Sequence, residues 1–214
     1  MTTAMQPSLH TERLLLSPFE AGDIPALHVI CADPAAMAFI GPVHRTPDNT
    51  YELIARFRGQ WALQGRGVYA LRHGDELVGW TGVFRPPSFP CDELGFLLKP
   101  SVQGSGLAAE ACRAVRDEWL RSRQGGEALV SFIASANTAS VRLARQLGAS
   151  NAGSWLVGSS IAHVYRHTDD VTLGWVLDDA AAIAAAAAPV LTPMQQAEAV
   201  ARRAVGKIRR TLQR

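Results

Sequence analysis

The stretch of residues 93–111 constrains the fold of this chain more than any other part of the sequence. An apolar run at residues 94–98 ends at Pro100, and two glycines, Gly104 and Gly106, follow it. The next segment places apolar side chains at helical spacing, namely Leu107, Ala111, Val115 and Trp119. The pattern predicts a strand, a glycine-rich loop and a helix. Such a loop leaves backbone N–H groups at the positive end of a helix dipole, which favours binding of an anion such as a phosphate.

Composition limits the classes of protein to which the chain can belong. Its 214 residues are 48% hydrophobic and carry a formal net charge of +2, which suits one core-forming domain with an appendage. No basic block precedes the C-terminal residues, and arginines are not interleaved with aromatic side chains. A nucleic-acid partner is therefore disfavoured.

Cysteine spacing and apolar runs bear on the compartment. Cys31, Cys91 and Cys112 are far apart and odd in number, which argues against a disulfide framework or a metal site. The first residues lack a basic segment followed by an apolar core, so we expect no signal peptide. The longest apolar run, residues 180–191, is too short to span a bilayer. These features predict a cytoplasmic protein with no membrane partner.

Hydrophobic periodicity and turn residues predict the remaining elements. Strands are expected at residues 10–19, 68–72, 76–85, 94–98, 128–134, 154–158 and 161–166. Helices are expected at residues 23–31, 48–63, 107–123 and 137–147, with weak helical character at 35–47. This order predicts an α+β domain over residues 1–168, with a mixed, mostly antiparallel twisted sheet flanked by helices.

Residues 169–214 differ in character from the rest. Residues 171–177 are either a short strand or an irregular apolar patch, and an alanine-rich helix is expected to end at Pro189. A final helix is expected from Pro193, with an apolar stripe on one side and basic side chains on the other, namely Arg202, Arg203, Lys207, Arg209 and Arg210. This C-terminal helical extension is expected to dock on its own domain or to form a homodimer. A membrane or nucleic-acid role is the less favoured alternative.

Three interpretations compete for the loop at residues 103–109. A dinucleotide fingerprint, G-x-G-x-x-A, fits formally, but residues 99–102 separate the first glycine from the strand. That fingerprint also needs a carboxylate at the end of the next strand, where this chain has none. A Walker-type loop needs Gly-Lys-Ser/Thr, which is absent here. The third interpretation depends on a family resemblance.

The loop resembles the pyrophosphate loop of the GNAT superfamily of acyl-CoA-dependent N-acetyltransferases, whose pattern is Q/R-x-x-G-x-G/A. Residues 103–108 read Gln-Gly-Ser-Gly-Leu-Ala and match its common Q-G-x-G-x-A form. Other segments are similar to the branch that includes the ribosomal-protein N-terminal acetyltransferases, namely residues 11–14, 93–96, 137–143 and 164–166. The resemblance covers residues 9–168 in register and implies the GNAT-like acyl-CoA N-acyltransferase fold.

The resemblance implies acetyl-CoA as the acetyl donor. Its pyrophosphate would bind backbone N–H groups of the loop, where the two glycines leave room for phosphate oxygens. Its pantetheine arm would pair with the preceding strand, and a backbone N–H near Leu97 or Leu98 would stabilise the developing oxyanion. Asn137 would cap a helix and also bond the arm. The residues expected to hold acetyl-CoA are Phe96, Leu97, Leu98, Gln103, Gly104, Ser105, Gly106, Leu107, Ala108 and Asn137.

Two residues are candidates for the catalytic chemistry. Glu93, at the start of the strand, is expected to take a proton from the amine through water, with a solvated strand-end carboxylate as the alternative. Many relatives protonate the thiolate with a tyrosine, but the matching position here is Ala144. Ser140 is a possible substitute, with an ordinary helix serine as the alternative, whereas Tyr165 is expected in the core. We expect no metal, because His163 and His167 would lie about 13 Å apart on a strand.

These assignments predict an enzyme that transfers acetyl from acetyl-CoA to a primary amine by direct attack in a ternary complex. The acceptor would be a protein or peptide N-terminus or a small-molecule amine. The alternative is a catalytically degenerate protein that binds CoA as a sensor or scaffold. The acceptor pocket is expected along residues 31–61, although the same side chains could be plain core. Its candidates are Met37, Phe39, His44, Phe57 and Trp61.

Overall fold

The computed structural model describes residues 7–123, 125–158, 160–178 and 181. The alanine-rich and basic helices expected near the C-terminus, and the homodimer expected through them, lie outside these residues. The strands are β1 (Leu9–His10), β2 (Leu15–Ser17), β3 (Val68–His73), β4 (Glu76–Phe84), β5 (Asp92–Leu98), β6 (Leu129–Ile133), β7 (Ser150–Val157) and β8 (Ser160–Arg166). The helices are α1 (Ile24–Cys31), α2 (Pro34–Met37), α3 (Pro47–Gln64), α4 (Leu107–Ser122) and α5 (Thr138–Gln146), with short 3-10 turns at Ala21–Asp23 and Pro100–Val102.

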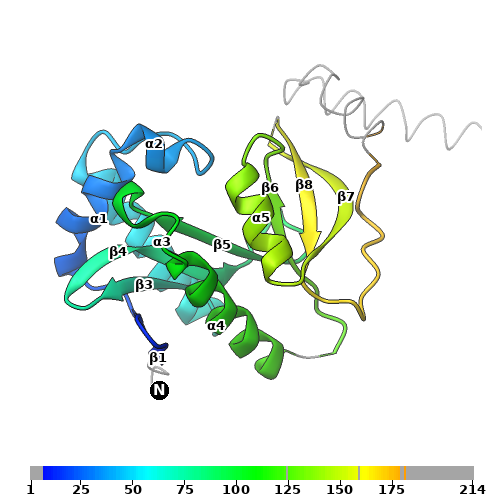
Figure 1. The fold of residues 1–214 in the computed structure, drawn as a ribbon, viewed down its shortest axis with the longest axis horizontal. Coiled ribbons are helices and arrows are strands. Elements are labelled where there is room, and N and C mark those ends of the chain that lie inside the picture. Colours follow the sequence, from blue (N-terminus) through cyan, green and yellow to red (C-terminus); the bar gives the residue numbers. More distant parts are fainter. Residues whose placement is uncertain (1–6, 124, 159, 179–180, 182–214) are drawn as a thin grey trace, which may run out of the picture.

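All eight strands form one sheet in the order β1-β2-β3-β4-β5-β6-β8-β7 (Figure 1). Within the described residues β5 and β6 are the one parallel pair, and the other neighbours run antiparallel. The α4 crossover returns the chain to β6, as a parallel pair requires. The predicted α+β class with a mixed, mostly antiparallel sheet is confirmed. Figure 1 also shows that β5 lies between the part of the sheet made of β1 to β4 and the part made of β6, β8 and β7.

The predicted opening strand at residues 10–19 is wrong, because the chain turns back within it. The N–H of Thr11 donates to the carbonyl of Leu14 (2.9 Å), and the N–H of Leu14 donates to the Thr11 hydroxyl (3.0 Å). β1 and β2 therefore form a small antiparallel hairpin, with Leu9 opposite Leu16. The turn has no glycine or proline, so its sequence lacks the usual hairpin signal. The hydrogen bond from the Leu14 N–H to the Thr11 hydroxyl stabilises the turn instead.

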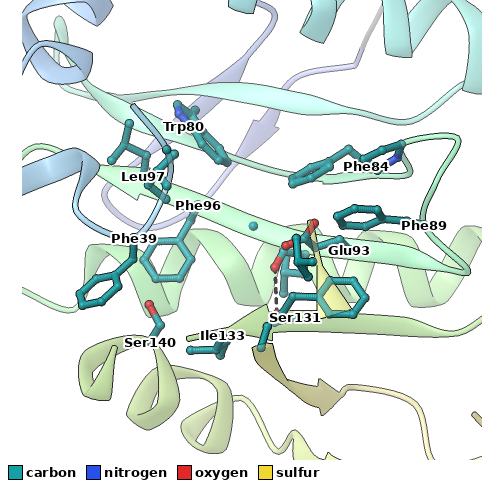
Figure 2. A pocket seen from close by; sticks show the side chains of 18 of the residues that line it. Phe39, Trp80, Phe84, Phe89, Glu93, Phe96, Leu97, Ser131, Ile133 and Ser140 are labelled. Carbon is teal, nitrogen blue, oxygen red and sulfur yellow. Dashed lines mark hydrogen bonds between the residues drawn. The ribbon is translucent and has the colours of Figure 1, made fainter. Parts of the chain in front are cut away.

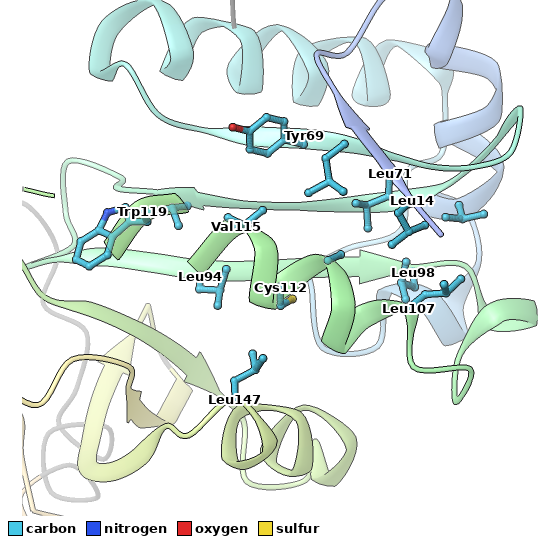
Figure 3. Packing of buried hydrophobic residues seen from close by; sticks show 14 of the residues in the cluster. Leu14, Tyr69, Leu71, Leu94, Leu98, Leu107, Cys112, Val115, Trp119 and Leu147 are labelled. Carbon is cyan, nitrogen blue, oxygen red and sulfur yellow. The ribbon is translucent and has the colours of Figure 1, made fainter. Parts of the chain in front are cut away.

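α4 covers one face of the sheet and supplies its main core (Figure 3). The helical spacing at Leu107, Ala111, Val115 and Trp119 buries all four side chains against the sheet. Leu94 and Leu98 of β5 belong to the same cluster, together with Leu147 from the end of α5. This packing fixes where α4 begins, and so it places the glycine loop against the end of β5.

α1, α2 and α3 cover the opposite face. Their buried side chains pack on Trp80 and Leu97, with Phe57 of α3 at the centre, 5.4 Å from the Trp80 ring and 5.7 Å from the Phe19 ring between ring centroids. α3 matches its predicted bounds to within one residue at each end, and Gly65 ends it in the left-handed conformation at φ 66°. Of the weak helix expected at 35–47, only α2 forms.

A buried ion pair anchors the beginning of β5. The Asp92 side chain is 2% exposed, accepts a bond from the Trp119 indole N–H (2.7 Å) and lies 3.1 Å from the Arg66 guanidinium. Burial raises the pKa of Asp92, and the bond from Trp119 opposes that shift. These contacts hold β5 in place just before Glu93.

Residues 171–177 pack on the same domain. Val171, Leu173 and Trp175 lie against a cluster built on Val130 and Val164 of neighbouring strands. A single bridge pairs Ser154 with Leu177. Of the two expectations for this segment, the irregular apolar patch describes it better than a strand.

Candidate active site

β5 and β6 pair only briefly and then diverge. Their parallel register joins Asp92 to Leu129 and Glu93 to Val130, and it ends there. At the next step the backbone N–H of Phe132 donates to the Glu93 side chain, and the Ser131 hydroxyl donates to the Leu94 carbonyl (2.8 Å). Side-chain bonds thus replace the ladder where the strands separate. The result is a gap in the sheet beside the second half of β5.

The hydrogen-bond pattern of β4 and β5 shows which main-chain groups face this gap. The N–H of Lys99 donates to the Val78 carbonyl (2.9 Å), so Val78 and Lys99 form a hydrogen-bonded pair. Antiparallel pairs alternate between hydrogen-bonded and non-hydrogen-bonded, and the register continues with Leu97 opposite Trp80. The main-chain groups of Leu97 therefore face β4, whereas those of Phe96 and Leu98 face the gap.

The glycine loop lies at the carboxyl end of β5. Residues 103–106 are exposed, and Gly104 and Gly106 have φ of 78° and 84°, a region that side chains rarely adopt. A Cβ added to Gly104 would meet nothing within 4 Å. The side chain of Gln103 donates back to the Leu98 carbonyl (3.0 Å). Gly106 is the N-cap of α4, so the loop presents backbone to solvent at a helix N-terminus.

A side-chain cluster ties the N-terminal hairpin to this loop. The Glu110 carboxylate accepts bonds from the Thr11 hydroxyl (2.6 Å), the Arg13 N–H (2.8 Å) and the Arg13 guanidinium (2.7 Å). The same guanidinium donates to the Ser105 carbonyl (3.0 Å). Burial acts to raise the pKa of Glu110, but these bonds outweigh it and hold that pKa below its usual value. We call Thr11, Arg13 and Glu110 the loop latch.

A cavity of about 1150 Å³ opens at the gap between β5 and β6. It is lined by α3 and the loop after α2 on one side and by α5 on the other, with β5 across its middle. Among the predicted site residues, those that line it are Glu93, Phe96, Leu97, Asn137 and Ser140. Leu98 and residues 103–108 lie outside the cavity, at the loop end of β5. The side chains of Leu98 and Leu107 are buried in the core, so only their backbone could take part in binding.

Glu93 lies in the apolar part of the cavity. Figure 2 shows Phe84 and Phe89 beside its side chain, on the far side of β5 from Ser140. Burial raises the pKa of Glu93 to about 8, although the N–H of Phe132 opposes the shift. The side chain keeps part of its surface open. A carboxyl with this pKa can both accept and release a proton near neutral pH.

α5 presents its first two turns to the cavity. Asn137 caps the helix, since its side-chain oxygen accepts the N–H of Ser140 (3.1 Å). Ser140 and Ala144 both line the cavity, one turn apart. Tyr165 is 2% exposed and packs in a core cluster with Ala144, as the sequence predicts.

Comparison with known proteins decides the family. Residues 13–150 match the family model described as an acetyltransferase (GNAT) domain, which is more than half of the chain. This chain is a GNAT acetyltransferase-family protein. The predicted fold and the resemblance to that superfamily are both confirmed.

Solved structures agree with this assignment. An acetyltransferase from Agrobacterium tumefaciens is 31% identical, with a TM-score of 0.68 over 76% of this chain and 95% of that one. RimL, a ribosomal-protein alpha-N-acetyltransferase solved with coenzyme A, is 18% identical, with a TM-score of 0.65 over 77% of this chain and 99% of that one. An acetyltransferase from Salmonella typhimurium that modifies the N-terminal serine of a ribosomal protein is 17% identical, with a TM-score of 0.62 over 73% of this chain and 95% of that one. The two RimL-type matches show a shared fold.

Sequence reasoning about this GNAT domain missed several cavity residues. Phe84, Phe89 and Phe132 line the cavity near Glu93 but come from three separate segments, with no motif to connect them. Ser131 and His167 also line it, 3.0 Å apart between the hydroxyl and Nε2. Burial lowers the pKa of His167 to about 4. Because Ser131 donates to Leu94, the neutral imidazole donates its Nε2–H to Ser131. The pair supports the point at which β5 and β6 separate.

Four of the five acceptor candidates line the cavity, namely Met37, Phe39, His44 and Phe57. Trp61 does not, because it points to the other face of α3, where its indole donates to the Val68 carbonyl (3.1 Å) and its ring lies 5.1 Å from Tyr69. His44 is held by the Thr50 hydroxyl (2.8 Å), and burial lowers its pKa. In the part of the chain that the structure describes, no helix is long and apolar enough to cross a membrane. That part also holds no group of three or more metal-ligating side chains.

Proposed function

We propose that this GNAT protein transfers an acetyl group from acetyl-CoA to a primary amine, by direct attack in a ternary complex. The acceptor is a protein or peptide N-terminus or a small-molecule amine. One observation supports the proposal above the others: β5 has an exposed glycine loop at its carboxyl end, a gap along its middle and a carboxyl of raised pKa at its beginning. A single strand thus offers a place for each part of the reaction.

The loop residues fit a diphosphate. Gly104 and Gly106 are exposed, and the nearest atom to a Cβ added at Gly106 would be the Arg13 guanidinium at 3.4 Å. The Arg13 guanidinium is a cation at the same loop, which offers the backbone N–H groups from Gly104 to Ala108 at the beginning of α4. The Gln103 N–H is already donated to the Pro100 carbonyl (3.1 Å). Backbone donors, a helix N-terminus and an arginine together suit a phosphate ligand. Ser105 contributes its backbone N–H, because its hydroxyl already donates to the Val102 carbonyl (2.5 Å).

The gap suits an extended chain with amide groups. The main-chain groups of Phe96 and Leu98 face it, and a pantetheine arm could pair with them as an added strand. Of the two residues expected to polarise the thioester carbonyl, Leu98 has its N–H on the correct side. Leu97 contributes its side chain to the cavity instead. Asn137 borders the same gap from α5, where its side-chain amide nitrogen could bond the arm while its oxygen caps the helix.

Glu93 is assigned the role of general base. It lies across β5 from Ser140 in the same cavity (Figure 2), and its pKa of about 8 is close to that of a peptide α-amine, about 8. Proton transfer between two groups of similar pKa costs little free energy. Glu93 would take the proton of the attacking amine, directly or through one water. Acetyl-CoA supplies the activated acyl group.

Ser140 is assigned the role of hydrogen-bond donor to the departing thiolate, which takes its proton from solvent. It lines the gap from α5 on the side away from Glu93, and the position one turn later is Ala144, which has no proton to give. A serine hydroxyl is a weak acid, so its contribution is a hydrogen bond to the thiolate rather than full proton transfer. We expect Ser140→Ala to lower kcat by no more than about tenfold, since solvent can replace a single neutral donor.

The test compares binding with turnover. Calorimetry measures CoA affinity, and release of free thiol measures acetyl transfer to a panel of peptide N-termini and small amines. Tight CoA binding with acetylation of at least one amine class supports the enzyme. Binding without transfer to any amine would favour the sensor or scaffold instead, and loss of binding would remove both.

A further inference from the structure

Phenylalanine is concentrated at the cavity. The chain has seven phenylalanines, and those that line the cavity are Phe39, Phe57, Phe84, Phe89, Phe96 and Phe132. The remaining one, Phe19, lies in the core beneath α1 and α3. A phenyl ring left beside an open cavity forgoes much of the free energy of burial. Phe57 is buried in the core, but the other five rings are partly or largely exposed around one opening and point to a ligand that covers them.

The mouth of the cavity is apolar as well. Within the described residues, five large hydrophobic side chains are exposed, and three of them line this cavity: Phe39 at 51%, Ile40 at 43% and Leu63 at 86%. They come from two separate segments, the loop after α2 and the end of α3. Exposed apolar side chains that gather at a binding cavity mark an interaction surface, whereas scattered ones do not.

Phe84, Phe89 and Phe132 line the cavity near Glu93, and we call them the aromatic wall. Ring contacts and a turn hydrogen bond hold this wall in place. The Phe89 and Phe132 rings meet edge to face at 5.1 Å, and Trp175 lies 6.1 Å behind Phe132. Phe89 sits in a proline-rich turn in which its N–H donates to the Pro86 carbonyl (2.9 Å). Such a wall is preorganised and loses little conformational entropy when a ligand binds.

We propose that the acceptor carries an aromatic or bulky apolar group next to its primary amine. This inference rests on the proposed acetyl transfer. The ammonium lies at Glu93, the one acidic residue among those described that line the cavity. The apolar group lies against Phe84, Phe89 and Phe132, the first two of which stand beside Glu93 in Figure 2.

Charge limits the rest of the acceptor. Arg56 and Arg85 also line the cavity, and both are exposed. Two guanidinium groups at the mouth repel an acceptor with further positive charges. Polyamines and lysine-rich N-termini are therefore excluded in favour of an amine with a single positive charge and an apolar flank.

The test uses two amines of equal spacing, 2-phenylethylamine and ethanolamine, with acetyl-CoA and the full chain. We expect kcat/KM to be at least about tenfold higher for the phenyl compound, as burial of one apolar side chain provides. Equal values, or a preference for ethanolamine, overturn the inference while leaving the proposed function standing. If neither amine is acetylated, calorimetry with the two N-acetylated products decides it. Tighter binding of the phenyl product supports the pocket, and equal binding overturns it.

A pair of variants assigns the preference to the cavity. Phe89 is partly exposed and lines the cavity beside Glu93 (Figure 2), whereas the exposed Tyr51 does not line it. We expect Phe89→Ser to reduce the ratio of the two kcat/KM values by about fivefold, since part of the apolar contact is lost. The control Tyr51→Ser leaves that ratio unchanged. An equal loss for both amines in Phe89→Ser would mean a structural role and would overturn this assignment.

Discussion

The two ends of β5, where we propose that acetyl-CoA and the acceptor bind, are built from different chemical groups. At the carboxyl end the loop offers backbone N–H groups, positive-φ glycines and the loop latch, all near the surface. At the amino end Glu93 lies among rings supplied by β4, β6 and the proline-rich turn. In the proposed function, the backbone site binds the parts that all acyl-CoA molecules share. A side-chain site can differ between relatives on one fold, so we assign to it the choice of acceptor.

The two ends of β5 also differ in the ionisation of their carboxyl groups. At the loop, hydrogen bonds hold the pKa of Glu110 below its usual value, so that carboxylate is charged and structural. At the amino end, burial raises the pKa of Glu93 to about 8, so that carboxyl exchanges its proton near neutral pH. The strand β5 thus separates a fixed charge, which positions the loop, from a titrating group, to which we assign the role of general base.

The largest effect is expected at the amino end, for Glu93→Gln. The substitution keeps the shape but removes the base, so kcat/KM should fall about 100- to 10,000-fold. With an alkylamine acceptor, whose pKa is about 10, the wild-type rate should rise with pH and level off near pH 8 as Glu93 deprotonates. The rate of the variant should keep rising, because only the neutral amine then reacts. A fall of less than threefold would falsify the base role.

Stability provides a second measurement for the same variant. The pKa of Glu93 is raised from 4.5 in the unfolded chain to about 8 in the fold. Between these values the folded state binds more protons than the unfolded state, so the free energy of unfolding falls as pH rises. Glu93→Gln should lose this slope, which denaturant titrations at several pH values between 5 and 8 would show. Parallel curves for the two proteins would contradict the raised pKa.

At the carboxyl end, Gly106→Val should weaken CoA binding by about 10- to 100-fold, the value of one or two charge-assisted hydrogen bonds. A valine at φ 84° both strains the loop and shields its N–H groups. Gly74→Val is the matched control, since Gly74 has φ 60° with open space around it and lies in the β3–β4 turn. Calorimetry with CoA should separate the two variants. Equal weakening in both would mean that strain alone, and no phosphate site, explains the loss.

The two ends of β5 were not equally predictable from the sequence. The loop was found because glycine pattern and helix periodicity report directly on backbone geometry. The aromatic wall was missed because Phe84, Phe89 and Phe132 meet only through the sheet order. The Trp61 prediction was wrong because α3 has apolar residues toward two clusters, and its periodicity does not say which faces the cavity. The β1–β2 turn was missed since Thr11 is held by Glu110, 99 residues away.

The loop latch should have a moderate effect. We expect Arg13→Ala to raise KM for acetyl-CoA by about three- to tenfold, as the guanidinium both supports Ser105 and lies beside Gly106. Glu110→Gln should act in the same direction without removing the cation. If Arg13 only stabilised the fold, both variants would change melting temperature but leave KM unchanged.

The loop latch also predicts that the free energy of unfolding depends on pH in the acid range. The folded pKa of Glu110 is lowered from 4.5, so its contribution to stability is present above that pH. It is lost as pH falls through the folded pKa. The difference in unfolding free energy between wild type and Glu110→Gln should therefore be constant near neutral pH and vanish in acid. A difference that persists to the lowest pH would contradict the hydrogen-bonded carboxylate.

The smallest effect is expected at Asn137. Variants of this residue can separate its role as the cap of α5 from its proposed bond to the pantetheine arm. Asn137→Ser keeps an oxygen that can cap α5 but removes the amide nitrogen, so stability should hold while CoA affinity falls about threefold. Asn137→Ala should lose the same affinity and also about 1 kcal/mol of unfolding free energy, because the Ser140 N–H loses its acceptor. Thermal unfolding and CoA calorimetry on both variants measure the two losses independently. If Asn137→Ser bound CoA as tightly as wild type, Asn137 would be a cap alone, and the gap would hold its ligand through the backbone of β5, as the loop does.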